Sequence, residues 1–449
     1  MAVSQFPLQY LMALKSLNPF ALVFGSSHER VNRFHRVLGR VIYTLLCCHA
    51  ALYLNFFVQT GIFQKRIVAG VVVLGLLAFF AMTLLNATAL RAVRNYSYRV
   101  FFVTHLLVAF SIPPLIFFHA KSARWYVGEA LVVLLVDLAS RKMDTVTSLA
   151  TLESIPGTGL VKVSAPIPYK KLDRFRQHPG SHVYVSVPPA ARQSSNPASS
   201  SYLLFEFLFN PFTVAHVDEQ NNGITLVARH LSGPMTSALA RLTGVGKRTP
   251  GPGSSSIASD EEAVPLNIEG PYTIPSHFPQ LSSGKYHRVL LVAGGIGATF
   301  TVPLYRALLH DNPNAKVEMV WAVRGAGDAT WAVMGDDGTG GITDDPNVHI
   351  FLTGDILNSD AATAESNSAD VELSPMPTGR RRSRNMADLS RRRPDLQKIV
   401  DGVFQHGSNE RVAVLVCGPA AMARELRQHV GVWVMKGRTV WWHNEGFGW

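Results

Sequence analysis

Three long runs without a charged residue dominate the first third of this 449-residue chain. They cover residues 41–64, 67–90 and 100–120 and hold 24, 24 and 21 residues. A helix of about 20 residues crosses the ~30 Å of hydrocarbon in a bilayer, so each run is long enough to span a membrane. A weaker run, Trp125–Ser140, carries Glu129 and Asp137 and ends before Arg141 and Lys142, and we expect it to form a fourth span.

Arginine residues flank these runs unevenly. Arg30, Arg33, Arg36 and Arg40 precede the first run, and Arg91, Arg94 and Arg99 separate the second from the third. The positive-inside rule therefore predicts a multi-pass membrane protein, in contact with lipid, whose large C-terminal part lies in the cytosol. Much of the formal net charge of +11 is then juxtamembrane arginine, and no basic patch interleaved with aromatic residues indicates nucleic-acid binding.

Two histidine pairs share one spacing, because His35 precedes His49 by 14 residues and His105 precedes His119 by 14. Fourteen residues of helix advance ~21 Å and leave the two imidazoles only ~40° apart around the axis. A lone histidine on an apolar face is often a hydrogen-bonded core residue, but an imidazole in lipid is costly and iron ligation is a standard reason for it. The repeated spacing predicts two stacked b-type haems, held by His35 and His105 near the cytosolic face and by His49 and His119 near the opposite face.

Two prolines, Pro113 and Pro114, lie between the second pair of histidines. Proline has no backbone N–H and clashes with the preceding turn of a helix. We therefore expect the helix to bend there and to leave backbone carbonyls without their usual partners.

The sequence changes character after Lys142. Alternating segments such as His182–Val187 indicate strands and suggest an antiparallel β-barrel over 145–275. From 286, an apolar strand, a glycine turn, a helix and a second strand follow in the order of a parallel, doubly wound sheet. Two stretches, 246–264 and 358–394, have compositions typical of disorder, and the basic second one is either a solvated insertion or a site for a partner or a phosphorylation switch.

Three motifs near the first histidine carry a resemblance to a known family. Asn18-Pro19-Phe20, Ser27–Arg30 and Phe34–Arg40 resemble the start of the first haem helix in fungal ferric reductases. These form a branch of the flavocytochrome b family, which also includes the superoxide-producing NADPH oxidases. The resemblance extends to Trp449, and because family members have additional spans upstream, the chain is expected to be a shortened member or an incomplete gene model.

The resemblance implies a multi-domain architecture. An N-terminal cytosolic or interfacial segment over 1–34 would precede a transmembrane α-helical haem-binding bundle of about four spans over 35–142. A ferredoxin-reductase-like, FAD-binding β-barrel over 145–275 and a Rossmann-like α/β NADPH domain over 286–449, with its disordered insertion at 358–394, would follow. The cofactors implied are FAD, two haem b and NADPH.

The resemblance places the flavin on several short segments. The implied FAD-binding residues are Asn210, Pro211, Phe212 and Thr213 in one strand, Arg229, Gly233, Met235 and Thr236 around the pyrophosphate, and Glu445 and Phe447 near the C-terminus. Relatives usually have histidine where this chain has Asn210. Asparagine still forms hydrogen bonds but cannot carry charge, so flavin potential or affinity would differ.

The resemblance places NADPH at two turns that follow apolar strands. The implied residues are Gly294, Gly295, Gly297 and Thr299 in the first turn, Arg324, and Cys417, Gly418 and Pro419 in the second turn. Bare N–H groups and a helix N-terminus in the first turn suit a diphosphate. Arg324 either contacts the 2′-phosphate or is a simple surface arginine. Cys417 would lie beside the nicotinamide, and Trp449 would cover the flavin as a gate, unless it is a packing anchor.

The implied activity is reduction of ferric chelates, or of cupric copper, on the side of the membrane opposite the nucleotide domain, with the plasma membrane as the expected location. Iron-uptake proteins would then be partners. Two alternatives stay open. An NADPH oxidase would pass the electrons to oxygen, and a non-enzymatic membrane scaffold would have lost electron transfer. The four histidines and the nicotinamide motifs disfavour the scaffold.

Overall fold

The computed structural model describes residues 1–192, 208–231, 233–243, 263–272, 281, 285–333, 341–342, 345–354, 393–407 and 409–446. The described chain forms two compact units, a helical unit from Met1 to Thr145 and a mixed unit that begins at Val146. The stretches predicted to be disordered lie almost wholly outside the described residues, as do Phe447 and Trp449.

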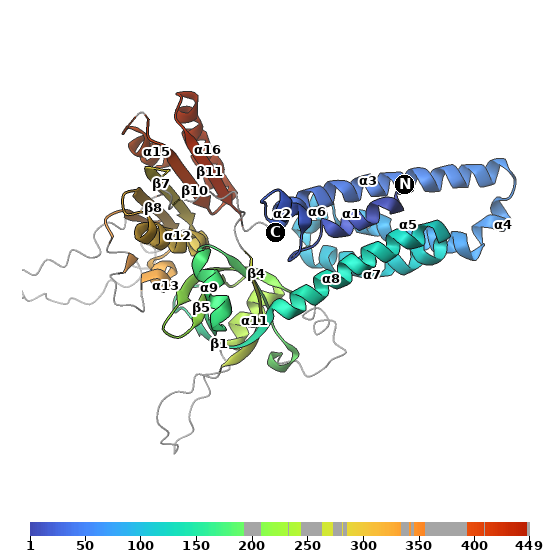
Figure 1. The fold of residues 1–449 in the computed structure, drawn as a ribbon, viewed down its shortest axis with the longest axis horizontal. Coiled ribbons are helices and arrows are strands. Elements are labelled where there is room, and N and C mark those ends of the chain that lie inside the picture. Colours follow the sequence, from blue (N-terminus) through green and yellow to red (C-terminus); the bar gives the residue numbers. More distant parts are fainter. Residues whose placement is uncertain are drawn as a thin grey trace, which may run out of the picture. The chain divides into compact units, whose positions relative to one another are not determined.

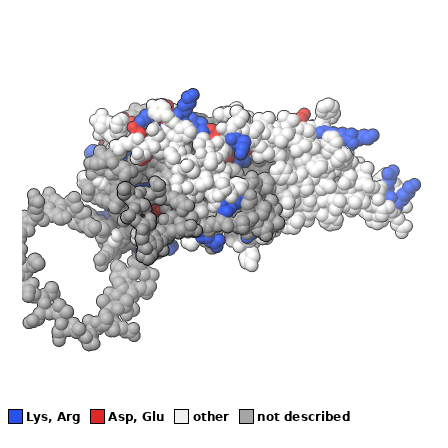
Figure 2. All heavy atoms as spheres, turned by 90° about the horizontal axis from the view of Figure 1, so that it is seen from below, with Lys and Arg blue, Asp and Glu red and all other residues white. Residues whose placement is uncertain are grey.

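The helical unit is built on long apolar helices (Figure 1). Its helices are α1 (Phe6–Leu11), α2 (Pro19–Val23), α3 (His28–Gln59), α4 (Phe63–Ile67), α5 (Gly70–Thr88), α6 (Arg91–Tyr96), α7 (Tyr98–His119) and α8 (Arg124–Asp144). Within the described residues three helices, α3, α5 and α7, are long and apolar enough to cross a membrane. At most 22% of the most apolar window of any of them is buried, so most of their apolar surface is left for lipid. Figure 2 shows the corresponding broad surface without charged side chains.

The fourth predicted span is only partly matched. α8 does form a helix of 21 residues, but it is not among the three spanning candidates. Its charged residues explain the difference, because every 18-residue window of α8 holds more than two of them. One of these, Asp137, is buried and accepts hydrogen bonds from the backbone N–H groups of Lys15 and Ser16. That carboxylate holds the chain after α1 against α8.

The N-terminal segment packs into the helical unit, although a domain boundary was expected at residue 34. Phe6 of α1 lies in one buried cluster with Ile42 of α3, Val108 of α7 and Val127 of α8. α3 begins at His28, so it starts before that boundary. α1 is thus part of the core of the helical unit.

The prolines of α7 are accommodated within the helix. α7 continues through Pro113 and Pro114 to His119. The missing N–H of Pro113 would leave the carbonyl of Ala109 without its partner four residues on. The Tyr10 hydroxyl of α1 donates to that carbonyl at 2.9 Å, so a side chain from another helix replaces the lost backbone hydrogen bond.

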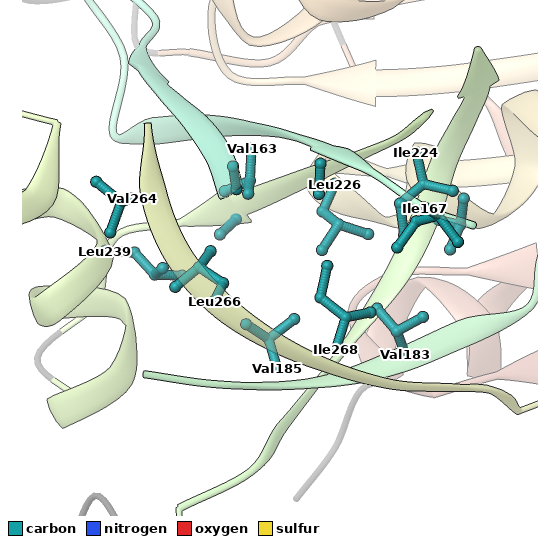
Figure 3. Close-up of a cluster of buried hydrophobic side chains, with 14 of the residues drawn as sticks. Val163, Ile167, Val183, Val185, Ile224, Leu226, Leu239, Val264, Leu266 and Ile268 are labelled. Atoms are coloured by element: carbon teal, nitrogen blue, oxygen red, sulfur yellow. The ribbon is translucent and has the colours of Figure 1, made fainter. Parts of the chain in front are cut away.

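The mixed unit begins with a closed barrel in the strand order β1-β2-β5-β4-β3-β6. The strands are β1 (Thr145–Ser154), β2 (Leu160–Pro166), β3 (His182–Ser186), β4 (Asn210–Asp218), β5 (Gly223–Arg229) and β6 (Val264–Tyr272), with helices α9 (Tyr169–Gln177) and α11 (Pro234–Leu242). The register alternates β-branched and leucine side chains into one apolar core, in which Val163, Leu226 and Leu266 face one another (Figure 3). The predicted antiparallel barrel is confirmed.

A five-stranded parallel sheet follows, in the order β11-β10-β7-β8-β9. Its strands are β7 (Arg288–Gly294), β8 (Lys316–Val323), β9 (Val348–Leu352), β10 (Val412–Cys417) and β11 (Val440–Glu445), and its helices include α12 (Ala298–Asp311), α13 (Thr330–Val333), α15 (Leu396–Phe404) and α16 (Ala420–Met435). Helices α15 and α16 pack on the face that carries Trp442. Phe300 of α12 stacks on His443, one residue further along β11 and hence on the opposite face. Helices therefore cover both faces, as the sequence predicts.

Candidate functional site

The structure brings the four histidines together in the two expected pairs. His35 and His49 lie on α3, and His105 and His119 lie on α7. The ring centroids of His35 and His105 are 6.2 Å apart, and those of His49 and His119 are 6.3 Å apart. The ring planes differ by 59° in the first pair, the inner pair, and by 89° in the second, the outer pair.

These spacings suit a metal between the rings. Two imidazoles that bind one metal in line, each with the ~2.0–2.1 Å bond typical of imidazole nitrogen, place their ring centroids about 6.3 Å apart. Both pairs match this separation. Two nitrogen ligands on opposite sides leave the equatorial positions to a planar ligand such as a porphyrin, so the donor set and its spacing fit haem iron.

Backbone carbonyls fix one ring of each pair. His35 Nδ1 lies 3.0 Å from the carbonyl oxygen of Gln9, and His119 Nδ1 lies 2.7 Å from that of Val71 in α5. A carbonyl only accepts hydrogen bonds, so both Nδ1 atoms are assigned the proton and both Nε2 atoms a lone pair. A metal ligand typically has this arrangement, in which the second nitrogen is held by an outer partner.

Gly75 explains how α5 comes so close to the outer pair. A Cβ on Gly75 would stand 2.5 Å from Cε1 of His119. Any other residue would push the ring away from the carbonyl of Val71. Sequence reasoning missed both Gly75 and Val71, since one glycine in an apolar run carries no specific signal.

The two predicted nucleotide turns meet at the carboxyl ends of adjacent strands. β7 and β10 pair in parallel, with Cys417 opposite Ala293. A Cβ on Gly294 would stand 2.5 Å from Cδ of Pro419, and one on Gly297 would stand 2.1 Å from the carbonyl oxygen of Cys417. The glycines are therefore required by close packing of the two turns, at the point where α12 begins.

Two polar side chains tie down the first nucleotide turn. Thr299 is buried, and its hydroxyl donates to the carbonyl of Ile296 at 2.9 Å. The buried indole of Trp321 donates to the carbonyl of Gly295 at 3.0 Å. The Thr299 hydroxyl thus closes the turn in this structure. Arg324 lies exposed just after β8, as a contact to a 2′-phosphate requires.

Cys417 lies next to the last described strand. It is fully buried and opposite Glu445 in the parallel register of β10 and β11. Burial raises the pKa of the Cys417 thiol well above its usual range, and the Glu445 carboxylate adds to that shift. Cys417 is therefore a neutral thiol at physiological pH.

Glu445 has a partner that sequence reasoning missed. His443 Nε2 lies 2.9 Å from Oε2 of Glu445, and the imidazole is nine-tenths or more buried between the rings of Phe300 and Trp441. Period-two alternation along β11 was the available signal, because it places residues 441, 443 and 445 on one face. The imidazole orients the carboxylate beside Cys417.

The predicted flavin residues lie on β4, at the end of β5 and at the start of α11. Arg229 forms an ion pair at 3.3 Å with Asp328, which follows β8 and was not predicted. The Thr236 hydroxyl donates to the carbonyl of Leu231 at 2.9 Å and so shapes the turn before α11. Met235 is completely buried in the barrel core, so its side chain packs the barrel and is not available to a ligand.

The strand residues of the flavin segment face different surroundings. Thr213 is buried opposite His182 of β3, and Pro211 lies opposite Tyr184. Phe212 packs against the barrel core, and Asn210 is half-buried at the beginning of β4. The segment therefore lies within the wall of the closed barrel, between β5 and β3.

Known proteins resemble this chain along most of its length. A family model described as the ferric reductase like transmembrane component matches residues 1–132, and one described as the ferric reductase NAD binding domain matches 286–431. The probable metalloreductase AIM14 of Meyerozyma guilliermondii is 22% identical over 405 residues, which are 87% of this chain and 72% of that protein.

Two further relatives come from Schizosaccharomyces pombe. Ferric/cupric reductase transmembrane component 2 is 20% identical over 465 residues, covering 98% of this chain and 78% of that protein. Ferric reductase transmembrane component 1 is 22% identical over 342 residues, covering 70% of this chain and 57% of that protein. A membrane helical unit with paired histidines and a nucleotide-binding sheet define a transmembrane oxidoreductase. The chain resembles the ferric reductase family in both its membrane helices and its nucleotide-binding sheet.

Proposed function

We propose that the chain is an NADPH-dependent ferric-chelate reductase of the plasma membrane that holds FAD and two b-type haems. Its acceptor would be ferric iron, or cupric copper, on the side opposite the nucleotide-binding sheet. The observation that carries the proposal is the pair of histidine pairs, each with the centroid spacing that one iron between two imidazoles requires. NADPH and the acceptor would then be used on opposite sides of the membrane.

Different residues of the chain would bind each cofactor. His35 with His105, and His49 with His119, would hold the two irons. The Gly294–Gly297 turn would admit the nicotinamide dinucleotide, with its diphosphate at the start of α12. Arg229 and the turn before α11 would bind the flavin pyrophosphate, and Arg324 would select the 2′-phosphate of NADPH.

Hydride chemistry would take place beside Cys417 and Glu445. Cys417 would place a neutral thiol next to the nicotinamide site, and His443 would keep the Glu445 carboxylate turned toward that thiol. Bound flavin would supply the change from two-electron hydride transfer to the single electrons that haem accepts. Trp449, outside the described residues, would regulate access of the nicotinamide.

The decisive experiment uses the full chain, purified in detergent and loaded with FAD and haem. Addition of NADPH should give a reduced-minus-oxidised b-type haem spectrum, and ferric chelate should reoxidise the haem faster than oxygen does. Reoxidation by oxygen with release of superoxide would favour the oxidase instead. Absence of haem reduction from a fully loaded protein would refute both.

A further inference from the structure

The short N-terminal helix α1 connects the two helices that carry the inner histidine pair. Gln9 contacts His35 of α3, and its neighbour Tyr10 donates a hydrogen bond to the carbonyl of Ala109 in α7, one turn beyond His105. Both residues lie on α1, between Phe6 and Leu11. The inner pair is therefore held from outside its own two helices.

Gln9 holds His35 at two points. Nδ1 of His35 donates to the backbone carbonyl of Gln9 at 3.0 Å, while the side-chain amide Nε2 of Gln9 donates to the backbone carbonyl of His35 at 3.1 Å. The same amide nitrogen lies 3.2 Å from Nε2 of His35. The His35 carbonyl fixes the orientation of the Gln9 amide. A carbonyl oxygen only accepts hydrogen bonds, so it must face the NH₂ group of the amide and not the amide oxygen.

Two further details show that this contact depends on the amide N–H groups. The Oε1 atom of Gln9 is buried without a hydrogen-bond partner, so the side chain is held through nitrogen alone. One turn along from His35, a Cβ on Gly39 would stand 3.2 Å from the amide nitrogen, so glycine leaves room for it. Position 9 is thus fitted to an amide of this length.

The outer pair has no equivalent side chain among the described residues. His119 is held by the backbone carbonyl of Val71, within the long helix α5, and by contact with Gly75. Substituting a side chain does not remove a backbone carbonyl. A single side chain outside the pair therefore helps to hold the inner histidine pair in place, whereas backbone holds the outer pair.

We propose that Gln9 is the positioning residue for the inner haem ligand His35, with α1 as the element that sets this site apart from the outer one. Through its contacts Gln9 keeps the proton on Nδ1, fixes the position of the ring and places its amide nitrogen against Nε2. Haem iron bound to Nε2 would replace the contact with the amide N–H, while the hydrogen bond to the His35 carbonyl would remain. This inference rests on the proposed haem-binding function.

The expected effect is a selective change at the inner haem. A hydrogen bond accepted from Nδ1–H makes the imidazole a stronger donor, which favours ferric iron. If residue 9 is no longer pinned to α3, its carbonyl moves away from Nδ1. The midpoint potential of the inner haem should then rise, or that haem should be lost, while the outer haem keeps its potential.

The test compares Gln9→Met with wild type in the full haem-loaded chain. Methionine keeps the length and apolar volume but has no N–H to donate. Redox titration with chemical mediators follows each haem without NADPH or FAD, and the ferric EPR signal reports ring orientation, which differs between the pairs at 59° and 89°. Gln59→Met, at the exposed far end of α3, is the matched control.

A changed potential, EPR signal or occupancy of the inner haem alone in Gln9→Met, with Gln59→Met unchanged, supports the inference. An unchanged titration, or equal changes at both haems, overturns it. If Gln9→Met does not assemble, Gln9→Asn keeps the amide but shortens its reach, and a wild-type inner haem in that variant would equally overturn the inference. Wild-type protein that binds no haem at all would refute the proposed function instead.

Discussion

Gly297 lies so close to Cys417 that a Cβ on the glycine would stand 2.1 Å from the cysteine carbonyl oxygen. The contact joins the turn after β7 to the end of β10. Both lie at the carboxyl ends of the parallel strands, where sheets of this kind bind their ligands. One packing requirement thus brings the predicted dinucleotide turn and the predicted nicotinamide cysteine to a single place.

Replacing Gly297 with alanine should therefore disrupt this edge. The obstacle is backbone, which cannot swing aside as a side chain would, so we expect a loss of about 1–3 kcal/mol in the stability of the sheet unit. Dinucleotide binding should weaken as well. Thermal unfolding and NADPH titration measure the two effects. Gly325→Ala is the control, because a Cβ there meets nothing within 4 Å. Equal behaviour of the two variants would contradict the packing argument.

Replacing His119 with leucine should remove the outer haem. The expected haem content falls to about half, because the inner pair uses different ligands and a two-histidine site needs both. Pyridine haemochrome analysis of the purified chain measures the content. His28→Leu is the control, since His28 lies on α3 beside Glu29 and outside both pairs. Full haem content in His119→Leu would exclude His119 as a ligand.

Sequence reasoning predicted the parts of this protein that follow from periodicity. The two histidine pairs, the barrel and the parallel sheet all depend on spacing that repeats along the chain. The fourth run is weaker because it carries Glu129 and Asp137. No local pattern indicates the structural partner of Asp137 in the chain after α1.

Long-range partners account for the rest of what sequence reasoning missed. Gln9 meets His35 from 26 residues away, and Asp328 meets Arg229 from 99 residues away. Such pairs depend on how the elements pack, which propensity and motif spacing do not encode. Pro113 is a partial exception. Its missing N–H predicted a backbone carbonyl without a hydrogen-bond partner in the helix, but not that the Tyr10 hydroxyl would donate to it.

Replacing Arg324 with alanine should reduce the preference for NADPH over NADH. A charged hydrogen bond is worth roughly 1.5–3 kcal/mol, so the ratio of the two kcat/KM values should fall by about 10- to 100-fold. Arg411→Ala is the matched control, because Arg411 is also exposed but precedes β10 at the opposite end of the strands. An unaltered ratio in Arg324→Ala would leave Arg324 as a simple surface arginine.

The raised pKa of Cys417 predicts both a protected thiol and a pH effect on stability. Thiolate is the form that alkylating reagents attack, so at pH 7 the folded chain should label at Cys417 far more slowly than the unfolded chain. Because the folded pKa lies above the unfolded one, near 8.5, this group contributes stability that is fully present below about pH 8.5 and is lost as pH rises toward the folded pKa.

A substitution at Glu445 tests what raises the pKa of the Cys417 thiol. Burial is the larger cause and Glu445 the smaller, so Glu445→Gln should lower the thiol pKa only in part and speed labelling modestly at pH 9. Mass spectrometry of peptides containing Cys417, after timed exposure to iodoacetamide, measures the rate in wild type and variant. Labelling of the folded wild-type chain at pH 7 as fast as the unfolded chain would show that Cys417 is an accessible thiolate. The neutral thiol proposed next to the nicotinamide site would then be wrong.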